Sequence, residues 1–87
     1  MNVRLYRKDD CPLCDDLKAD LLALQQEIGF VVEERNIEAD PVARERYRYL
    51  IPVLDIEGGA LLYPPHDFLT IRQALVDARD ATRNRPV

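Results

Sequence analysis

The sequence predicts an α/β domain of the order βαβαββα, with a mixed sheet of about four strands and helices on both of its faces. The first part of the chain has the pattern of a strand, a long amphipathic helix and a second strand, a unit that pairs its strands in parallel with a right-handed crossover. Later, Gly58-Gly59 separates two short apolar segments, which indicates an antiparallel hairpin. The 87 residues are enough for one domain, which we take to span 1–87.

The first strand is expected at residues 2–7, because polar and apolar residues alternate there. Val3 and Leu5 fall on one face of this strand, and Arg4 and Tyr6 on the other.

The first helix is expected to begin at Pro12, since proline suits the first helical position, where a backbone N–H has no partner. Gly29 follows as a cap of positive φ. Apolar residues at spacings of three and four predict one buried stripe. Its members are Leu13, Leu17, Leu21, Leu24 and Ile28.

The middle of the chain predicts a strand over residues 30–37 and then a short helix. Asp40-Pro41 combines an N-cap residue with a proline at the first position. We expect this helix to run to about Tyr49 and to end before Ile51-Pro52, because the residue before a proline avoids helical angles.

The last part predicts a hairpin and a final helix. Strands are expected at residues 53–56 and, at the edge of the sheet, 60–63, joined by a two-residue turn at Gly58-Gly59. Asp67 is expected to cap the last helix. Its buried face would carry Phe68, Ile71, Leu75 and Val76, and the tail 84–87 is expected to be frayed.

Composition and charge exclude several classes of function. The net charge of −4 and the mixed signs along the chain argue against a nucleic-acid-binding surface, which needs clustered basic residues. No apolar run approaches the roughly 20 residues that span a bilayer, and residues 1–7 are too short and polar for a secretory leader. We therefore expect a cytoplasmic protein that binds neither nucleic acid nor membrane, in a compartment where thiols stay reduced.

Both cysteines of the chain lie where the first strand gives way to the first helix. Only a thiolate attacks a disulfide sulfur, and Cys11 falls at the helix cap, where unpaired N–H groups and the helix dipole favour an anion. Cys14 follows three residues later, so the two sulfurs are neighbours. We predict Cys11 as the exposed nucleophile and Cys14 as the shielded resolving thiol.

Nearby charges act on the Cys11 thiolate in opposite directions. Lys8 and the helix dipole stabilise it, whereas four aspartates of residues 9–16 oppose it, all of them screened by solvent. The sequence leaves the net effect open.

Other uses of the cysteines are less well supported. Two inert buried thiols would also satisfy the pattern, but they would not need this spacing at a strand-to-helix junction. A structural zinc site wants four ligands, and the chain offers only Cys11, Cys14 and a distant His66, which we expect to be exposed in a loop. No metal site is therefore expected.

At this point the sequence resembles the glutaredoxin branch of the thioredoxin superfamily over nearly its whole length. The residues that carry the resemblance are Lys8, Cys11-Pro12-Leu13-Cys14 and Ile51-Pro52-Val53, together with the glycine pair of the hairpin. More narrowly, Asp40-Pro41, the Ile-Pro-Val-Leu segment and Asp67 resemble a family of small bacterial glutaredoxin-like proteins.

The resemblance implies a thioredoxin-like fold in which the Ile51–Pro52 bond is cis and lies against the cysteine pair. It also implies that the backbone of Ile51 pairs with a substrate chain. On this basis Lys8, Pro12, Leu13, Ile51 and Pro52 are the expected substrate-binding residues.

The sequence departs from glutaredoxins at the residues that recognise glutathione. Leu13 stands where an aromatic residue is usual, and Leu50-Ile51 precedes the proline in place of threonine and valine. Ala60-Leu61-Leu62 follows the glycine pair where glutaredoxins have acidic residues that hold the glutathione amine. We expect no cofactor, glutathione being the one small molecule that the resemblance suggests.

Three functions remain open, and the dithiol favours the first. It is a thiol–disulfide oxidoreductase acting, as a monomer, on disulfide-containing proteins or on low-molecular-weight thiol substrates. The second is a non-catalytic module that binds a partner protein at the Ile51-Pro52 edge. The third is an iron–sulfur carrier, with Cys11 of two chains and two external thiols holding one cluster.

Overall fold

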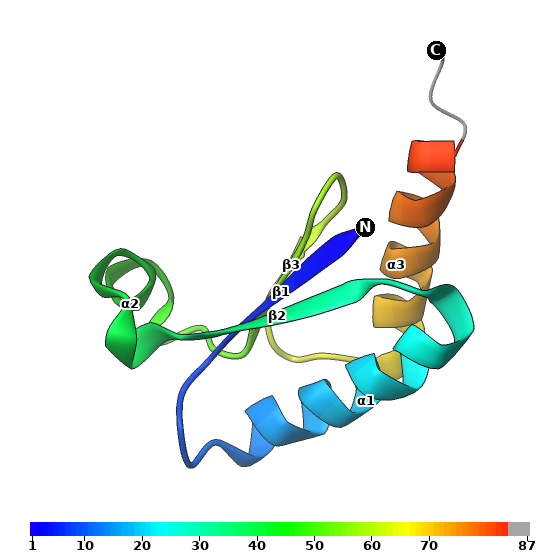
Figure 1. Ribbon diagram of the computed structural model, residues 1–87. Coiled ribbons are helices and arrows are strands. Elements are labelled where there is room, and N and C mark those ends of the chain that lie inside the picture. Colours follow the sequence, from blue (N-terminus) through cyan, green and yellow to red (C-terminus); the bar gives the residue numbers. More distant parts are fainter. Residues whose placement is uncertain (84–87) are drawn as a thin grey trace.

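The computed structural model describes residues 1–83 and confirms the predicted order of elements (Figure 1). The predicted frayed tail lies outside the described residues. The elements are β1 (Asn2–Arg7), α1 (Pro12–Ile28), β2 (Val31–Asn36), a 3-10 turn η1 (Ile37–Ala39), α2 (Pro41–Tyr47), β3 (Val53–Ile56), β4 (Leu61–Leu62) and α3 (Phe68–Arg83). Only η1 has no counterpart in the prediction.

The sheet is mixed and has the strand order β2-β1-β3-β4. β1 pairs in parallel with β2, with Val3 opposite Val32. On its other side β1 pairs antiparallel with β3, with Leu5 opposite Leu54, and β3 pairs antiparallel with β4. The two central strands β1 and β3 therefore carry the residues that both faces of the sheet must bury.

The main core lies between the sheet and the helices α1 and α3. Val3 and Leu5 point into it, as the alternation predicts, and the stripe of α1 lies against them. The observed stripe of α1 is Cys14, Leu17, Leu21, Leu24 and Ile28. The prediction was wrong for Leu13, which is 65% exposed, because Cys14 holds the position one turn before Leu17.

Within residues 1–83, the opposite face of the sheet is covered only at one end, by α2. There Tyr47 and Ala43 of α2 bury Val53, with Tyr6 and Ile37 packed beside them. Helices thus lie on both faces, as predicted. In Figure 1, α2 lies at the same end of the sheet as the loop that leads from β1 into α1.

The predicted helix caps are confirmed. The Asp40 side chain accepts a hydrogen bond from the Ala43 N–H at 3.1 Å, and Asp67 accepts one from the Thr70 N–H at 3.0 Å. α2 ends at Tyr47, two residues before the predicted end. In α3 the buried residues are Ile71, Leu75 and Ala78, and Phe68, which was predicted to be buried, is 40% exposed.

An ion pair joins α1 to α3 at the surface. The guanidinium of Arg72 donates to the carboxylate of Glu27, and this hydrogen bond lowers the pKa of Glu27. Both side chains are substantially exposed, so solvent screens the pair. The contact therefore adds little to the apolar packing that holds these two helices together.

The turn between β3 and β4 is longer than predicted. The Gly59 N–H donates to the Ile56 carbonyl at 2.9 Å, and the Ile56 N–H donates to the Ala60 carbonyl at 3.0 Å. These hydrogen bonds enclose a loop of residues 57–59, not a turn of the two glycines alone. Of these two glycines, Gly58 has a positive φ, of 74°, and Gly59 does not. β4 consists of two residues, Leu61–Leu62, where a strand over 60–63 was predicted.

Gly59 is required for a different reason, the close approach of α3 to the turn. A Cβ atom at Gly59 would lie 2.8 Å from the Cβ of Ala78 and 3.0 Å from Cγ2 of Ile56. We expect Gly59→Ala to lower the free energy of unfolding by about 1–3 kcal/mol, because overpacking forces the helix or the turn to shift. Urea denaturation measures this change.

Glu57→Ala, in the same turn, is the matched control, since Glu57 is exposed and should change stability by less than about 0.5 kcal/mol. Equal stability of Gly59→Ala and the wild type would contradict the steric argument.

Candidate functional site

The two cysteines lie at the N-terminus of α1 and are joined as a disulfide. Cys11 is the N-cap, and Pro12 is the first helical residue. The Cys14 N–H donates to the Cys11 Sγ at 3.2 Å, and the two Cα atoms are 5.2 Å apart. Asp10, with a φ of 55°, turns the chain into the helix, a conformation that aspartate tolerates better than most residues. The predicted proximity of the two sulfurs is confirmed.

Cys11 is more exposed than Cys14, as predicted, but the exposed fraction of Cys11 is smaller than predicted. Cys11 is 8% exposed and Cys14 is fully buried, so Cys11 is the more accessible of the two. It is much less exposed than predicted, because in the disulfide its Sγ turns toward the sulfur and the N–H of Cys14. Only an edge of Cys11 reaches solvent in this state.

The segment before β3 forms the second part of the site. The Ile51–Pro52 peptide bond is cis, which confirms the prediction. Pro52 is buried and Ile51 is half-buried. The Pro52 carbonyl accepts a hydrogen bond from the Nε2 of His66 at 2.6 Å. The prediction of an exposed His66 was wrong: this contact holds the ring half-buried.

A pocket of about 440 Å³ lies between α1 and the segments around Pro52 and His66. Its lining residues are Leu13, Asp16, Leu17, Asp20, Pro52, Pro64, Pro65 and His66. Of the expected substrate-binding residues, Leu13 and Pro52 line this pocket, whereas Lys8, Pro12 and Ile51 do not. Leu13 directly precedes Cys14, so the pocket begins beside the disulfide.

Comparisons with known proteins agree with this geometry. The model of the glutaredoxin-like domain (DUF836) family matches residues 2–76. The chain belongs to this glutaredoxin-like family. The X-ray structure of a Northeast Structural Genomics target protein from X. campestris is similar, with 31% sequence identity and a TM-score of 0.68, covering 86% of this chain and 96% of that one. No curated protein matches the sequence. The fold is therefore the thioredoxin-like α/β fold that the resemblance implied.

In this glutaredoxin-like chain, sequence reasoning missed the cation that the fold fixes near the dithiol. Arg7, at the end of β1, donates to Asp15 at 2.8 Å and forms a second ion pair with Glu34 at 3.5 Å. Its side chain is only 16% exposed. Lys8, the predicted cation, is exposed and makes no hydrogen bond or ion pair within residues 1–83. Arg7 thus neutralises Asp15, one of the aspartates expected to oppose the Cys11 thiolate.

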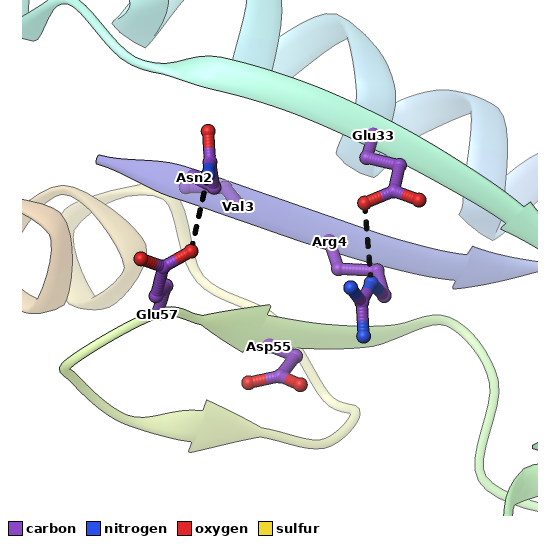
Figure 2. Close-up of a pocket in the computed structure, with 6 residues that line it drawn as sticks. All are labelled: Asn2, Val3, Arg4, Glu33, Asp55 and Glu57. Carbon is purple, nitrogen blue, oxygen red and sulfur yellow. Dashed lines mark hydrogen bonds and ion pairs between the residues drawn. The ribbon is translucent and has the colours of Figure 1, made fainter.

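A second hollow, of about 210 Å³, lies on the part of the sheet face that α2 leaves uncovered. Figure 2 shows that polar side chains of β1, β2 and the end of β3 line it. Arg4 donates to Glu33 at 3.3 Å, and Asn2 donates to Glu57 at 3.1 Å. The hollow contains no thiol and lies toward the start of β1, whereas the dithiol follows the end of that strand. We assign it no part in the site around the cysteine pair.

A cluster of metal ligands and a membrane-spanning helix are both absent from residues 1–83 of this glutaredoxin-like chain. Within residues 1–83, no three histidine, cysteine or acidic side chains converge as metal ligands would. Over the same residues, no helix has both the length and the apolar character that crossing a bilayer requires.

The cap geometry predicts a stability difference that is independent of redox chemistry. With the disulfide reduced, Cys11→Ser keeps an acceptor for the Cys14 N–H, whereas Cys11→Ala leaves that donor unpaired. We expect Cys11→Ala to be less stable than Cys11→Ser by about 1 kcal/mol, measured by urea denaturation under reducing conditions.

The control is Ala19→Ser. Ala19 is exposed and lies in the middle of α1, so the wild-type alanine should be more stable there than serine. If alanine were also the more stable residue at position 11, the capping role of Cys11 would be refuted.

Proposed function

We propose that this glutaredoxin-like protein is a thiol–disulfide oxidoreductase. The observation that carries the proposal is the Cys11–Cys14 disulfide at the N-terminus of α1. In the reduced state, the Cys14 N–H and the positive end of the helix dipole would stabilise a thiolate on Cys11. The difference in burial gives the two thiols different roles, since only Cys11 reaches the surface.

The reaction consists of two exchanges of sulfur partners. The Cys11 thiolate attacks one sulfur of a substrate disulfide, the substrate S–S bond breaks, and the first thiol leaves as a thiolate that takes a proton from water. Cys14 then loses its proton and attacks the Cys11 sulfur, which releases the second substrate thiol and forms the Cys11–Cys14 disulfide. The substrate gains two electrons and the dithiol loses two, so two external thiol groups, which become a disulfide, must reduce the protein for the next cycle.

The surroundings of the dithiol support a substrate that lies across Leu13 and Pro52. Both residues line the pocket beside the disulfide, and Leu13 exposes most of its side chain. We propose that Lys8, Pro12 and Ile51 complete the contact from outside the pocket. The substrates would be disulfide-containing proteins or low-molecular-weight disulfides, in the cytoplasm, where other thiols can return the dithiol to its reduced form.

A single-turnover reaction tests the proposal. Reduced protein is mixed with an excess of a chromogenic aryl disulfide, and released thiol is measured by absorbance and mass spectrometry. The wild type should release two equivalents of aryl thiol and end as the internal disulfide. Cys14→Ser should release one equivalent and remain as a mixed disulfide on Cys11. Cys11→Ser should react on the order of 100-fold more slowly, because Cys14 is buried.

Cys11→Ser is preferred to Cys11→Ala here because serine preserves the helix cap, and circular dichroism of both serine variants checks the fold. Wild-type rates in Cys11→Ser would refute the assignment of Cys11 as the nucleophile. Two equivalents released by Cys14→Ser would refute the resolving role of Cys14.

A further inference from the structure

The pocket beside the disulfide has an apolar floor and two carboxylates in its wall. Leu13, Asp16, Leu17 and Asp20 occupy successive positions on one face of α1, at spacings of three and four. Prolines and His66 form the other wall. Asp16 and Asp20 therefore face the same apolar space, two and six residues after Cys14.

Neither carboxylate has a basic residue beside it on its own helix. Positions 12, 13 and 19, which neighbour Asp16 on the helix, and positions 17, 23 and 24, which neighbour Asp20, carry no lysine or arginine. Each aspartate has the other as its charged neighbour, and such like-charged pairs destabilise a helix by about 0.2–0.5 kcal/mol. Within residues 1–83 neither aspartate forms an ion pair, whereas Asp15, Glu27, Glu33 and Glu34 all do.

The cations nearest in sequence are held elsewhere. Arg7 binds Asp15 and Glu34, and Lys18 binds Glu34 at 3.2 Å. His66 lines the pocket, but its Nε2 is bonded to the Pro52 carbonyl. Lys8 is the one free cation of residues 7–20, and it is outnumbered by the unpaired carboxylates of the same segment, at positions 9, 10, 16 and 20.

From these observations we propose that the pocket binds the side chain of a lysine or arginine next to the reacting cysteine of a polypeptide disulfide. The aliphatic stem would pack on Leu13, Leu17 and the prolines, and its cationic head would reach Asp16 and Asp20. Long basic side chains combine such a stem with a charged tip. This inference rests on the proposed function and adds the class of substrate to it.

A polypeptide fits this pocket because its occupant must be tied to a sulfur that meets Cys11. Adjacent residues in an extended chain lie about 3.8 Å apart at Cα, so a residue one or two positions from the substrate cysteine reaches the mouth of the pocket beside Leu13. Glutathione carries two carboxylates and one ammonium group, and the carboxylates of this surface would repel its net negative charge. The surface therefore favours basic peptides over glutathione.

The test compares three peptide disulfides that share one sequence and one chromogenic leaving group. The residue after the cysteine is lysine, norleucine or glutamate. Second-order rate constants for the reduced wild type should fall in that order, with lysine about 10-fold faster than glutamate at low ionic strength. In D16N/D20N this ratio should approach one. Added salt should also reduce the wild-type ratio.

The control is E57Q/D77N, which removes two exposed charges far along the chain from the pocket residues of α1 and changes the net charge equally. It should keep the wild-type preference. Equal rates for all three peptides, or a preference that survives in D16N/D20N or disappears in the control, would overturn the inference. So would a preference for cystamine, a small cationic disulfide, without one for the lysine peptide. Failure of the proposed function looks different, since then no peptide would react.

Discussion

The packing of one helix face against the sheet sets the arrangement of the whole site. The stripe that runs from Cys14 through Leu17 and Leu21 to Ile28 is buried against β1 and β3, and this contact fixes the rotation of α1. With that rotation fixed, Cys14 must lie inside the core and Cys11 must lie at its edge. The same rotation turns Leu13, Asp16 and Asp20 toward the pocket. The different burial of the two cysteines, on which their proposed roles rest, thus follows from the way a helix buries its apolar residues.

Local patterns predicted most of the fold. Alternation identified β1, proline and glycine marked the ends of α1, and Asp40 and Asp67 marked the starts of α2 and α3. Each of these signals depends on residues within one or two turns of each other, so a single sequence contains it in full. The cysteine pair belongs to the same class, since its spacing and its place before a helix are both local. Errors arose where two patterns competed, as at Leu13, where a leucine continued the apolar spacing but Cys14 took the buried position.

The remainder of the site depends on contacts between distant parts of the chain. His66 meets Pro52 across 14 residues, and Arg7 meets Glu34 across 27. The pocket exists only because α1 and the segment before α3 lie side by side. No periodicity or cap in the sequence indicates such contacts, because they are set by the order of the strands and by the packing of the helices. Asp16 illustrates the limit: in the sequence it is one more acidic residue of residues 9–16, and only the fold gives it an apolar pocket to face.

The burial of Cys14 directly beneath Cys11 also bears on damage by peroxide. An oxidant that reaches the exposed edge of Cys11 in the reduced protein would form a sulfenic acid there, the first step of a series that becomes irreversible at the sulfinic acid. A thiol one helical turn away condenses with the sulfenic acid, releases water and returns the pair to the disulfide. Because Cys14 is fully buried, it is itself shielded from the oxidant. Under the proposed function, the placement that would resolve a mixed disulfide would therefore also keep Cys11 from being lost to overoxidation.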